Sequence, residues 1–139
     1  MPVIPELGLS NFLGGGGTET HFNNRADMEA YLDNWMSDSS NYVEVTFFQF
    51  SDGTFLVYRD DESTASYNKV PTIQYNPSTN IYSYNGQTII GRGHTHDDNS
   101  FPSNSDFESS AKTPGLSTSV YVGNGIYVTY GSNNYNGQG

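Results

Sequence analysis

The sequence contains no cysteine, which excludes disulfide frameworks and thiolate metal sites. Positive charge is scarce: Lys and Arg together number 5, whereas Asp and Glu together number 15, which gives a formal net charge of −10. Nucleic acids and anionic membranes are both bound through clustered Lys and Arg. We therefore expect no nucleic-acid partner and no membrane partner, and the charge favours a neutral or basic partner.

Long apolar runs are also missing. No stretch approaches the ~20 apolar residues of a membrane span, and residues 1–10 lack the basic and apolar regions of a signal peptide. We expect a soluble chain, either cytoplasmic or exported as part of a larger protein. Aromatic residues make up 14% of the chain, with 11 Tyr and 8 Phe, which favours β structure.

The length of 139 residues fits one domain. Residues 1–17 contain two prolines and the run Gly14–Gly17, which is typical of a flexible leader or linker. A linker behind a longer polypeptide and a short disordered leader both remain open. Residues 131–139 have no periodic apolar pattern and predict a flexible tail. The folded domain is expected over residues 18–130.

The clearest helix begins at Asn23 or Asn24, either of which is a good N-cap, and ends at residues 39–41. Its apolar residues recur at helical spacing and form one core-facing stripe: Met28, Tyr31, Leu32, Trp35 and Met36. A second, shorter helix is expected from Ser103 to about Lys112, where Pro114 follows. His21, just before the first helix, is interpreted as a surface histidine rather than a supplementary metal ligand.

Most of the remaining chain predicts strands, several of them joined by hairpin turns such as Asp52-Gly53 and Asn85-Gly86. The expected strands cover residues 42–50, 54–58, 73–75, 81–84, 88–96, 120–122 and 126–130. The predicted fold is therefore α+β or α/β. It has a central, mainly antiparallel mixed sheet, flanked by the N-terminal helix and the short later helix.

The residues with the clearest chemistry lie between His94 and Asp106. Residues i and i+2 of a strand face the same side, so His94 and His96 can hold a divalent metal together. They can equally be two surface or hydrogen-bonded histidines. Ser103 and Asp106 share one face at the start of the second helix. A capping box alone would explain this pair, although a carboxylate at that position can also face a metal.

The combination of H-x-H, a short loop and P-S-x-x-D resembles the signature of the JAMM/MPN metalloproteases, the JAB fold. The resemblance implies that His94, His96 and Asp106 hold one Zn²⁺ per chain and that Ser103 is an active-site serine. It also implies the cytidine-deaminase-like layering of that fold. Two departures are present: Asp97 replaces the usual proline after the second histidine, and the loop before Ser103 is one residue shorter. Both affect loop shape and substrate access.

The same family uses a glutamate on an early strand as general base, and Glu44 occupies that place. Glu44 lies in an apolar segment, where a carboxylate is costly without a partner. A strand residue facing solvent on an edge is the alternative. Glu62 is the competing acid, but its polar loop indicates a solvated side chain. Arg92, two residues before His94, is expected to pair with an acid near the site.

The function implied by the resemblance is zinc-dependent hydrolysis of a peptide or isopeptide amide. A zinc-bound water attacks the carbonyl, Glu44 takes its proton, and Ser103 donates a hydrogen bond to the oxyanion. The substrate would be a protein or peptide, such as a ubiquitin-like protein or a cell-wall peptide. The Gly-rich leader and the Asn/Tyr/Gly-rich composition also resemble the JAB-like C-terminal domains of bacterial RHS and polymorphic-toxin proteins. That resemblance implies an effector or toxin domain, with the parent polypeptide or an immunity-type protein as partner.

Two alternatives remain open. One is a non-catalytic JAB-fold module that binds metal or a protein partner. The other is a secreted structural β domain, suggested by the Asn, Ser, Tyr and Gly content, which predicts no metal and no dependence on either histidine of the H-x-H pair.

Overall fold

The computed structural model describes residues 17–38, 42–96 and 102–130. This part of the chain forms an α+β fold with eight strands in one mixed sheet and two helices. The expected leader and tail, and the predicted helix end at residues 39–41, lie outside the described residues. The elements are β1 (Gly17–Phe22), α1 (Arg25–Ser37), β2 (Thr46–Phe50), β3 (Phe55–Asp60), β4 (Gln74–Asn76), β5 (Ile81–Tyr84), β6 (Gln87–Thr95), α2 (Asn104–Ala111), β7 (Ser117–Gly123) and β8 (Ile126–Tyr130).

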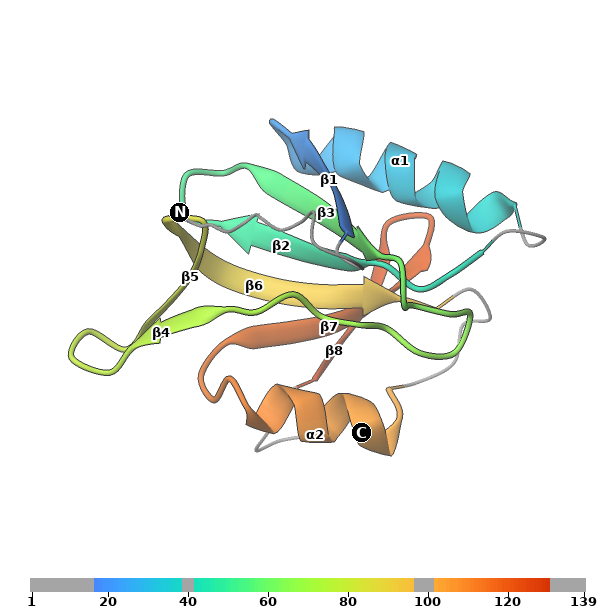
Figure 1. Ribbon diagram of the computed structural model, residues 1–139. Helices are drawn as coiled ribbons and strands as arrows, with labels where there is room; N and C mark the ends of the chain where they lie inside the picture. Colours follow the sequence, from blue (N-terminus) through green and yellow to red (C-terminus); the bar gives the residue numbers. More distant parts are fainter. Residues whose placement is uncertain (1–16, 39–41, 97–101, 131–139) are drawn as a thin grey trace.

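The sheet is built around β6. Its strand order is β1-β3-β2-β6-β5-β4, and β7 also pairs with β6 and carries β8. Every pairing is antiparallel except that of β6 with β7. Parallel neighbours need a crossover connection, and α2 lies within this one. The two helices lie on opposite sides of the sheet (Figure 1). Neither is long and apolar enough to cross a membrane.

The predicted helices are confirmed. Asn24 is the N-cap of α1, and its side chain accepts a hydrogen bond from the Asp27 N–H at 2.8 Å. Met28 and Leu32 of the apolar stripe are fully buried. Ser103 caps α2 with a complete capping box. The mainly antiparallel mixed sheet is confirmed as well.

The largest differences from the predicted strands are one strand that was predicted too long and one that was missed. Residues 42–45 are not part of β2, which begins at Thr46. β1 was missed, because its segment Gly-Thr-Glu-Thr-His-Phe is mostly polar and exposed. An edge strand with solvent on its face lacks the alternating apolar residues from which strands are predicted. Its pairing with β3 over six residue pairs stabilises it instead.

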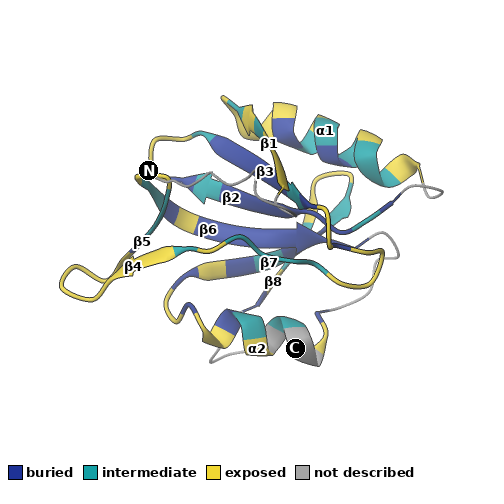
Figure 2. Ribbon diagram, viewed as in Figure 1, coloured by how far each residue is buried: buried dark blue, intermediate teal, exposed yellow. Residues whose placement is uncertain are grey.

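The sheet has an apolar core on each face. Met28 and Leu32 of α1 pack with Phe47 and other residues of one face. Phe48 and Leu56 belong to the core on the other face. Because strand residues alternate between faces, neighbours such as Phe47 and Phe48 enter different cores. Burial is concentrated on the central strands, whereas β4 is exposed (Figure 2).

Tyrosine hydroxyls bind several of the carboxylates in this acidic chain. Four such hydrogen bonds measure 2.6–2.7 Å, and they join Tyr58 to Asp60, Tyr84 to Glu19, Tyr121 to Asp33 and Tyr127 to Glu29. The last two fasten α1 to β7 and β8. Burial, and then the hydrogen bond to the carboxylate, raises the pKa of each of these four phenols.

These bonds predict a loss of stability in alkali. The unfolded chain releases its phenol protons near pH 10, while the four raised phenols keep theirs in the folded chain. The free energy of unfolding should therefore fall as the pH rises above about 10. Urea unfolding at pH 8 and pH 10.5 measures this. In the variant Tyr121→Phe/Tyr127→Phe, stability at pH 8 should be lower by about 1 kcal/mol for each lost bond.

The same double variant should lose less stability than the wild type between the two pH values. Tyr67→Phe is the control, because Tyr67 is 53% exposed and its loss should leave both measurements unchanged. An equal alkaline loss in the wild type and the double variant would contradict this explanation.

Candidate metal centre

His94 and His96 lie at the C-terminal end of β6. His94 pairs with Thr46 of β2 and with Val120 of β7. The His96 N–H continues this pattern by donating to the Tyr121 carbonyl at 3.0 Å. Both histidines are buried, and their Nε2 atoms lie 3.2 Å apart. The pair thus shares one face, as the spacing predicts, and the surface interpretation is wrong.

Gly93 allows β6 to bring His94 into this position. A Cβ atom at Gly93 would lie 2.2 Å from the Ser119 carbonyl oxygen and 2.4 Å from the Phe47 ring. The face of β6 opposite the two histidines therefore has no room for a side chain at this residue. Any larger residue would push β6 away from β2 or β7.

Glu44 lies in the extended segment that leads into β2. Its N–H donates to the Thr64 carbonyl at 2.8 Å, and the preceding Val43 carbonyl accepts from the Trp35 indole at 2.9 Å. The side chain does not face solvent: the residue is 8% exposed, and Oε2 lies 3.9 Å from His96 Nε2. The competing acid, Glu62, is exposed and pairs with Lys69 at 3.1 Å.

Asp106 joins the start of α2 to the histidine pair. Its Oδ2 accepts from the Ser103 N–H at 2.7 Å, and its own N–H donates to Ser103 Oγ at 3.2 Å. Oδ1 lies 3.1 Å from His94 Nε2, and Oδ2 lies 3.5 Å from His96 Nε2. The capping role and the site-facing role are therefore filled by the same carboxylate. Because Ser103 Oγ accepts in the cap, its O–H can still donate to another group.

The surroundings of Asp106 favour its ionised form. Burial raises the pKa of this carboxyl group. The hydrogen bond and charge of His94, together with the Ser103 N–H, outweigh that effect and leave the pKa below its ordinary value. Asp106 is therefore a carboxylate at neutral pH, the form that binds a metal.

The arrangement meets the distance requirement of a metal site. Glu44, His94 and His96 lie close enough to hold a metal ion, with ligand atoms all within 4.8 Å of one another. The separations among His94, His96 and Asp106 are shorter, at 3.1–3.5 Å. Tetrahedral zinc with bonds of about 2.0–2.2 Å places its ligand atoms about 3.3–3.6 Å apart. Nitrogen and carboxylate oxygen are also ligands that zinc accepts.

The four side chains open into a cleft of about 980 Å³, which Ser103 also lines. Residues 65–73 form part of its wall. Asn68 in this wall donates to Thr46 Oγ1 at 2.7 Å, while its Oδ1 is buried and has no hydrogen-bond partner. Sequence reasoning missed Asn68, because nothing in its polar loop indicates that its side chain lines the cleft. Asp97, the departure from the family pattern, lies outside the described residues.

The expectation that Arg92 pairs with an acid near the site was wrong. Arg92 does not pair with an acid among the described residues. Its guanidinium donates instead to the Thr113 hydroxyl and to the Ser109 carbonyl and hydroxyl, at 2.7–3.2 Å. Burial lowers the pKa of Arg92 below its usual value, although an arginine remains protonated in proteins.

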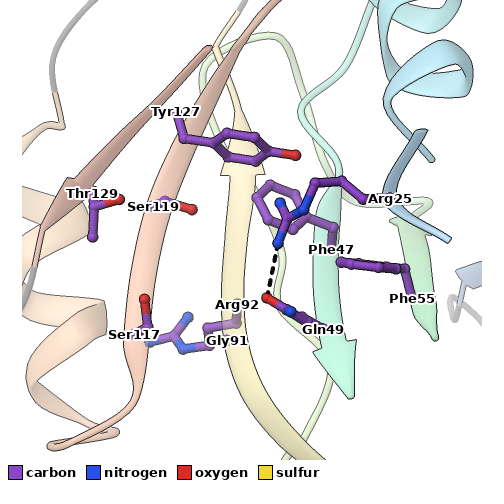
Figure 3. Close-up of a pocket in the computed structure, with 10 residues that line it drawn as sticks. All are labelled: Arg25, Phe47, Gln49, Phe55, Gly91, Arg92, Ser117, Ser119, Tyr127 and Thr129. Carbon is purple, nitrogen blue, oxygen red and sulfur yellow. Dashed lines mark hydrogen bonds between the residues drawn. The ribbon is translucent and has the colours of Figure 1, made fainter. Parts of the chain in front are cut away.

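A second, smaller hollow of about 220 Å³ lies beside β6 and does not contain the histidine pair. Figure 3 shows Arg25 reaching across it to Gln49, with Nη2 3.1 Å from Oε1, beneath Tyr127. No histidine or carboxylate is among the described residues that line it. His21 is exposed and lies 3.5 Å from Glu19, as expected for a surface histidine. The candidate metal centre is therefore the larger cleft.

No protein-family model, curated protein or solved structure matches this chain.

The geometry predicts zinc binding. Protein purified without a nickel column should hold about one zinc per chain by mass spectrometry, and added zinc should raise the melting temperature. His94→Ala should abolish both effects, because it removes one of the two closely spaced imidazoles. His21→Ala is the matched control and should bind zinc as the wild type does. Zinc content that is equal in both variants would place the metal elsewhere.

Proposed function

We propose that the chain is a zinc-dependent amide hydrolase of the JAMM type. The observation that carries this proposal is the set of distances in the cleft. The two imidazole Nε2 atoms lie 3.2 Å apart, and Asp106 places one oxygen 3.1 Å from His94 and the other 3.5 Å from His96, close to the spacing of tetrahedral zinc ligands. The buried carboxylate of Glu44 lies beside them. The helices on opposite sides of one mixed sheet support the JAB-like layering.

In this proposal His94, His96 and Asp106 hold the zinc and leave a fourth position open, as catalytic zinc sites do. Zinc bound in this way lowers the pKa of its water to about 7 and polarises a carbonyl group. Glu44 lies farther from His96 than the other ligand atoms do, at 3.9 Å. That position suits a group that acts on a bound water rather than on the metal.

The chain's own residues then supply the proton transfer and the stabilisation of charge. Glu44 accepts the proton of the attacking water and delivers it to the leaving nitrogen. Ser103 donates its O–H to the oxygen that becomes negative as the carbonyl is attacked.

The proposed substrate is a protein or peptide amide, with a ubiquitin-like protein and a cell-wall peptide as the two classes that the family resemblance suggests. A role as a bacterial effector or toxin domain, held by its parent polypeptide or an immunity-type partner, belongs to the same proposal.

A second candidate function is a metal-binding module without catalysis. It is favoured by the fact that Glu44 lies within ligand distance of both histidines. If Glu44 joins the other three residues on the metal, the site has four protein ligands. Such a closed set is the structural zinc pattern and leaves no position for a reactive water.

Glu44→Gln distinguishes the two. If Glu44 is the base, the variant should keep its zinc and lose about 10²–10⁴-fold in hydrolysis. If it is a ligand, zinc affinity should fall. Zinc content and cleavage of a diverse peptide library, read by mass spectrometry, measure the two properties on one sample. Glu62→Gln is the control, and library cleavage that is identical in wild type and His94→Ala would refute the hydrolase.

Ser103 is tested by a pair of substitutions. Ser103→Ala should slow hydrolysis about 10²–10³-fold, because one oxyanion donor is lost, and should destabilise α2 by about 1 kcal/mol through loss of the cap. Ser103→Thr keeps both the hydroxyl and the cap and should retain most of the activity. Equal activity of the alanine and threonine variants at a temperature where both are folded would remove Ser103 from the mechanism.

A further inference from the structure

The positive charge of the chain is concentrated around the metal centre. The chain has 5 Lys and Arg, and three of them, Lys69, Arg92 and Lys112, line the cleft. The other two lie over aromatic rings elsewhere: Arg25 is 5.2 Å from the Tyr127 ring centroid and Arg59 is 5.4 Å from that of Trp35. The acidic excess of the whole chain, which favours a neutral or basic partner, therefore does not describe the charge that a ligand meets in the cleft.

The guanidinium of Arg92 is held firmly but only by neutral groups. Nε donates to Thr113 Oγ1 at 3.1 Å, and Nη2 donates to the carbonyl and hydroxyl of Ser109 at 2.7 and 3.2 Å. The residue is 7% exposed, and burial of a charge is costly unless an opposite charge accompanies it. Among the described residues no carboxylate does so. Nη1 has no hydrogen-bond partner in the described part of the chain, and Arg92 lines the cleft.

The spacing of Arg92 and His94 along β6 matches the spacing of residues in an extended peptide ligand. Arg92 is two residues before His94 and on the same face of β6, so the two Cα atoms are about 6.6–6.8 Å apart. An extended peptide spans a similar length with two residues. Because Arg92 lines the same cleft as His94 and Asp106, we expect a ligand whose carbonyl lies at the metal centre to bring a carboxylate, one or two residues away, to the guanidinium.

The other two cations of the cleft, Lys69 and Lys112, differ in whether an acid of the chain already pairs with them. Lys69 already pairs with Glu62 at 3.1 Å. Lys112, the C-cap residue of α2, is exposed and has no ion pair among the described residues. Lys112 therefore adds an uncompensated positive charge to the rim of the cleft, on the side of Arg92.

We propose that the cleft recognises peptides that carry a carboxylate within two residues of the amide at the metal centre, and that Arg92 binds this carboxylate through Nη1. An arginine with one fixed edge presents its other donors in the planar geometry that a carboxylate accepts. The carboxylate comes from a peptide C-terminus or from an acidic side chain. The cleavage of such peptides rests on the proposed hydrolase function, but their binding does not.

The test compares three small probes by NMR titration of the ¹⁵N-labelled chain. N-acetylglycine carries a main-chain carboxylate, N-acetylglutamate N-methylamide carries a side-chain carboxylate, and N-acetylglycinamide is neutral. The chain should bind at least one of the two acids about tenfold or more tightly than the neutral amide, the usual strength of a charged hydrogen bond. The acid that binds more tightly identifies the source of the carboxylate.

Two further measurements assign the binding to Arg92. Its Nε–H resonance should shift with the acid and not with the neutral amide. Arg92→Gln should reduce the preference for the acid to near unity, whereas Arg59→Gln, which removes the same charge outside the cleft, should keep it. If Arg92→Gln does not fold, the shift of the Arg92 Nε–H resonance in the wild-type chain still shows whether Arg92 binds the acid. Equal affinity for acids and amide, or binding that leaves the Arg92 resonance unmoved, overturns the proposal.

The titrations are done on both zinc-free and zinc-loaded protein, because a carboxylate can also bind zinc directly. Preference for the acid in the zinc-free chain supports Arg92 as its partner. Preference that requires zinc and survives Arg92→Gln places the carboxylate on the metal and refutes this inference while leaving the hydrolase proposal intact. If the chain prefers the acid but cleaves no peptide in a zinc-dependent way, the inference about Arg92 is supported and the hydrolase proposal is refuted.

Discussion

The carboxylate of Asp106 connects the two parts of the molecule from which the candidate site is built. One oxygen lies 3.1 Å from His94 at the end of β6, while the other caps α2 through the Ser103 N–H at 2.7 Å. The cap stabilises the start of α2, and the position of that helix start brings the Asp106 carboxylate to the histidine pair. Loss of Asp106 would affect the start of α2 and the metal centre together.

The sheet fixes the other half of the site. β6 is bonded to β2 on one edge and to β7 on the other, so His94 cannot move without disturbing three strands. Gly93 has no space for a side chain on the opposite face. Glu44 enters from the segment before β2, which the Trp35 indole and the Thr64 carbonyl hold in place. A metal would therefore meet side chains positioned by the fold rather than by a flexible loop.

The parts that sequence reasoning predicted are those with a local cause. The Asn24 cap, the apolar stripe of α1 and the capping box of α2 act over a few residues, and all three are present. β1 was missed because its stability comes from pairing with a distant strand. The acid expected for Arg92 is absent among the described residues, because neutral oxygens of Ser109 and Thr113 take its place. Spacing predicted the histidine pair, whereas Glu44 and Asp106 were assigned to it only through the family resemblance, because residues so far apart in the chain are brought together by the fold.

The hydrogen bonds between tyrosines and carboxylates have a consequence for the behaviour of the chain in salt. A fold held by ion pairs weakens as dissolved ions screen the opposite charges. Here the donors to Asp33, Glu29, Glu19 and Asp60 are neutral phenols, so screening removes little of their attraction. What salt does screen is the repulsion among the many acids of this chain. Rising ionic strength thus relieves an unfavourable interaction while leaving these four contacts in place, so added salt should not lower the free energy of unfolding of this chain.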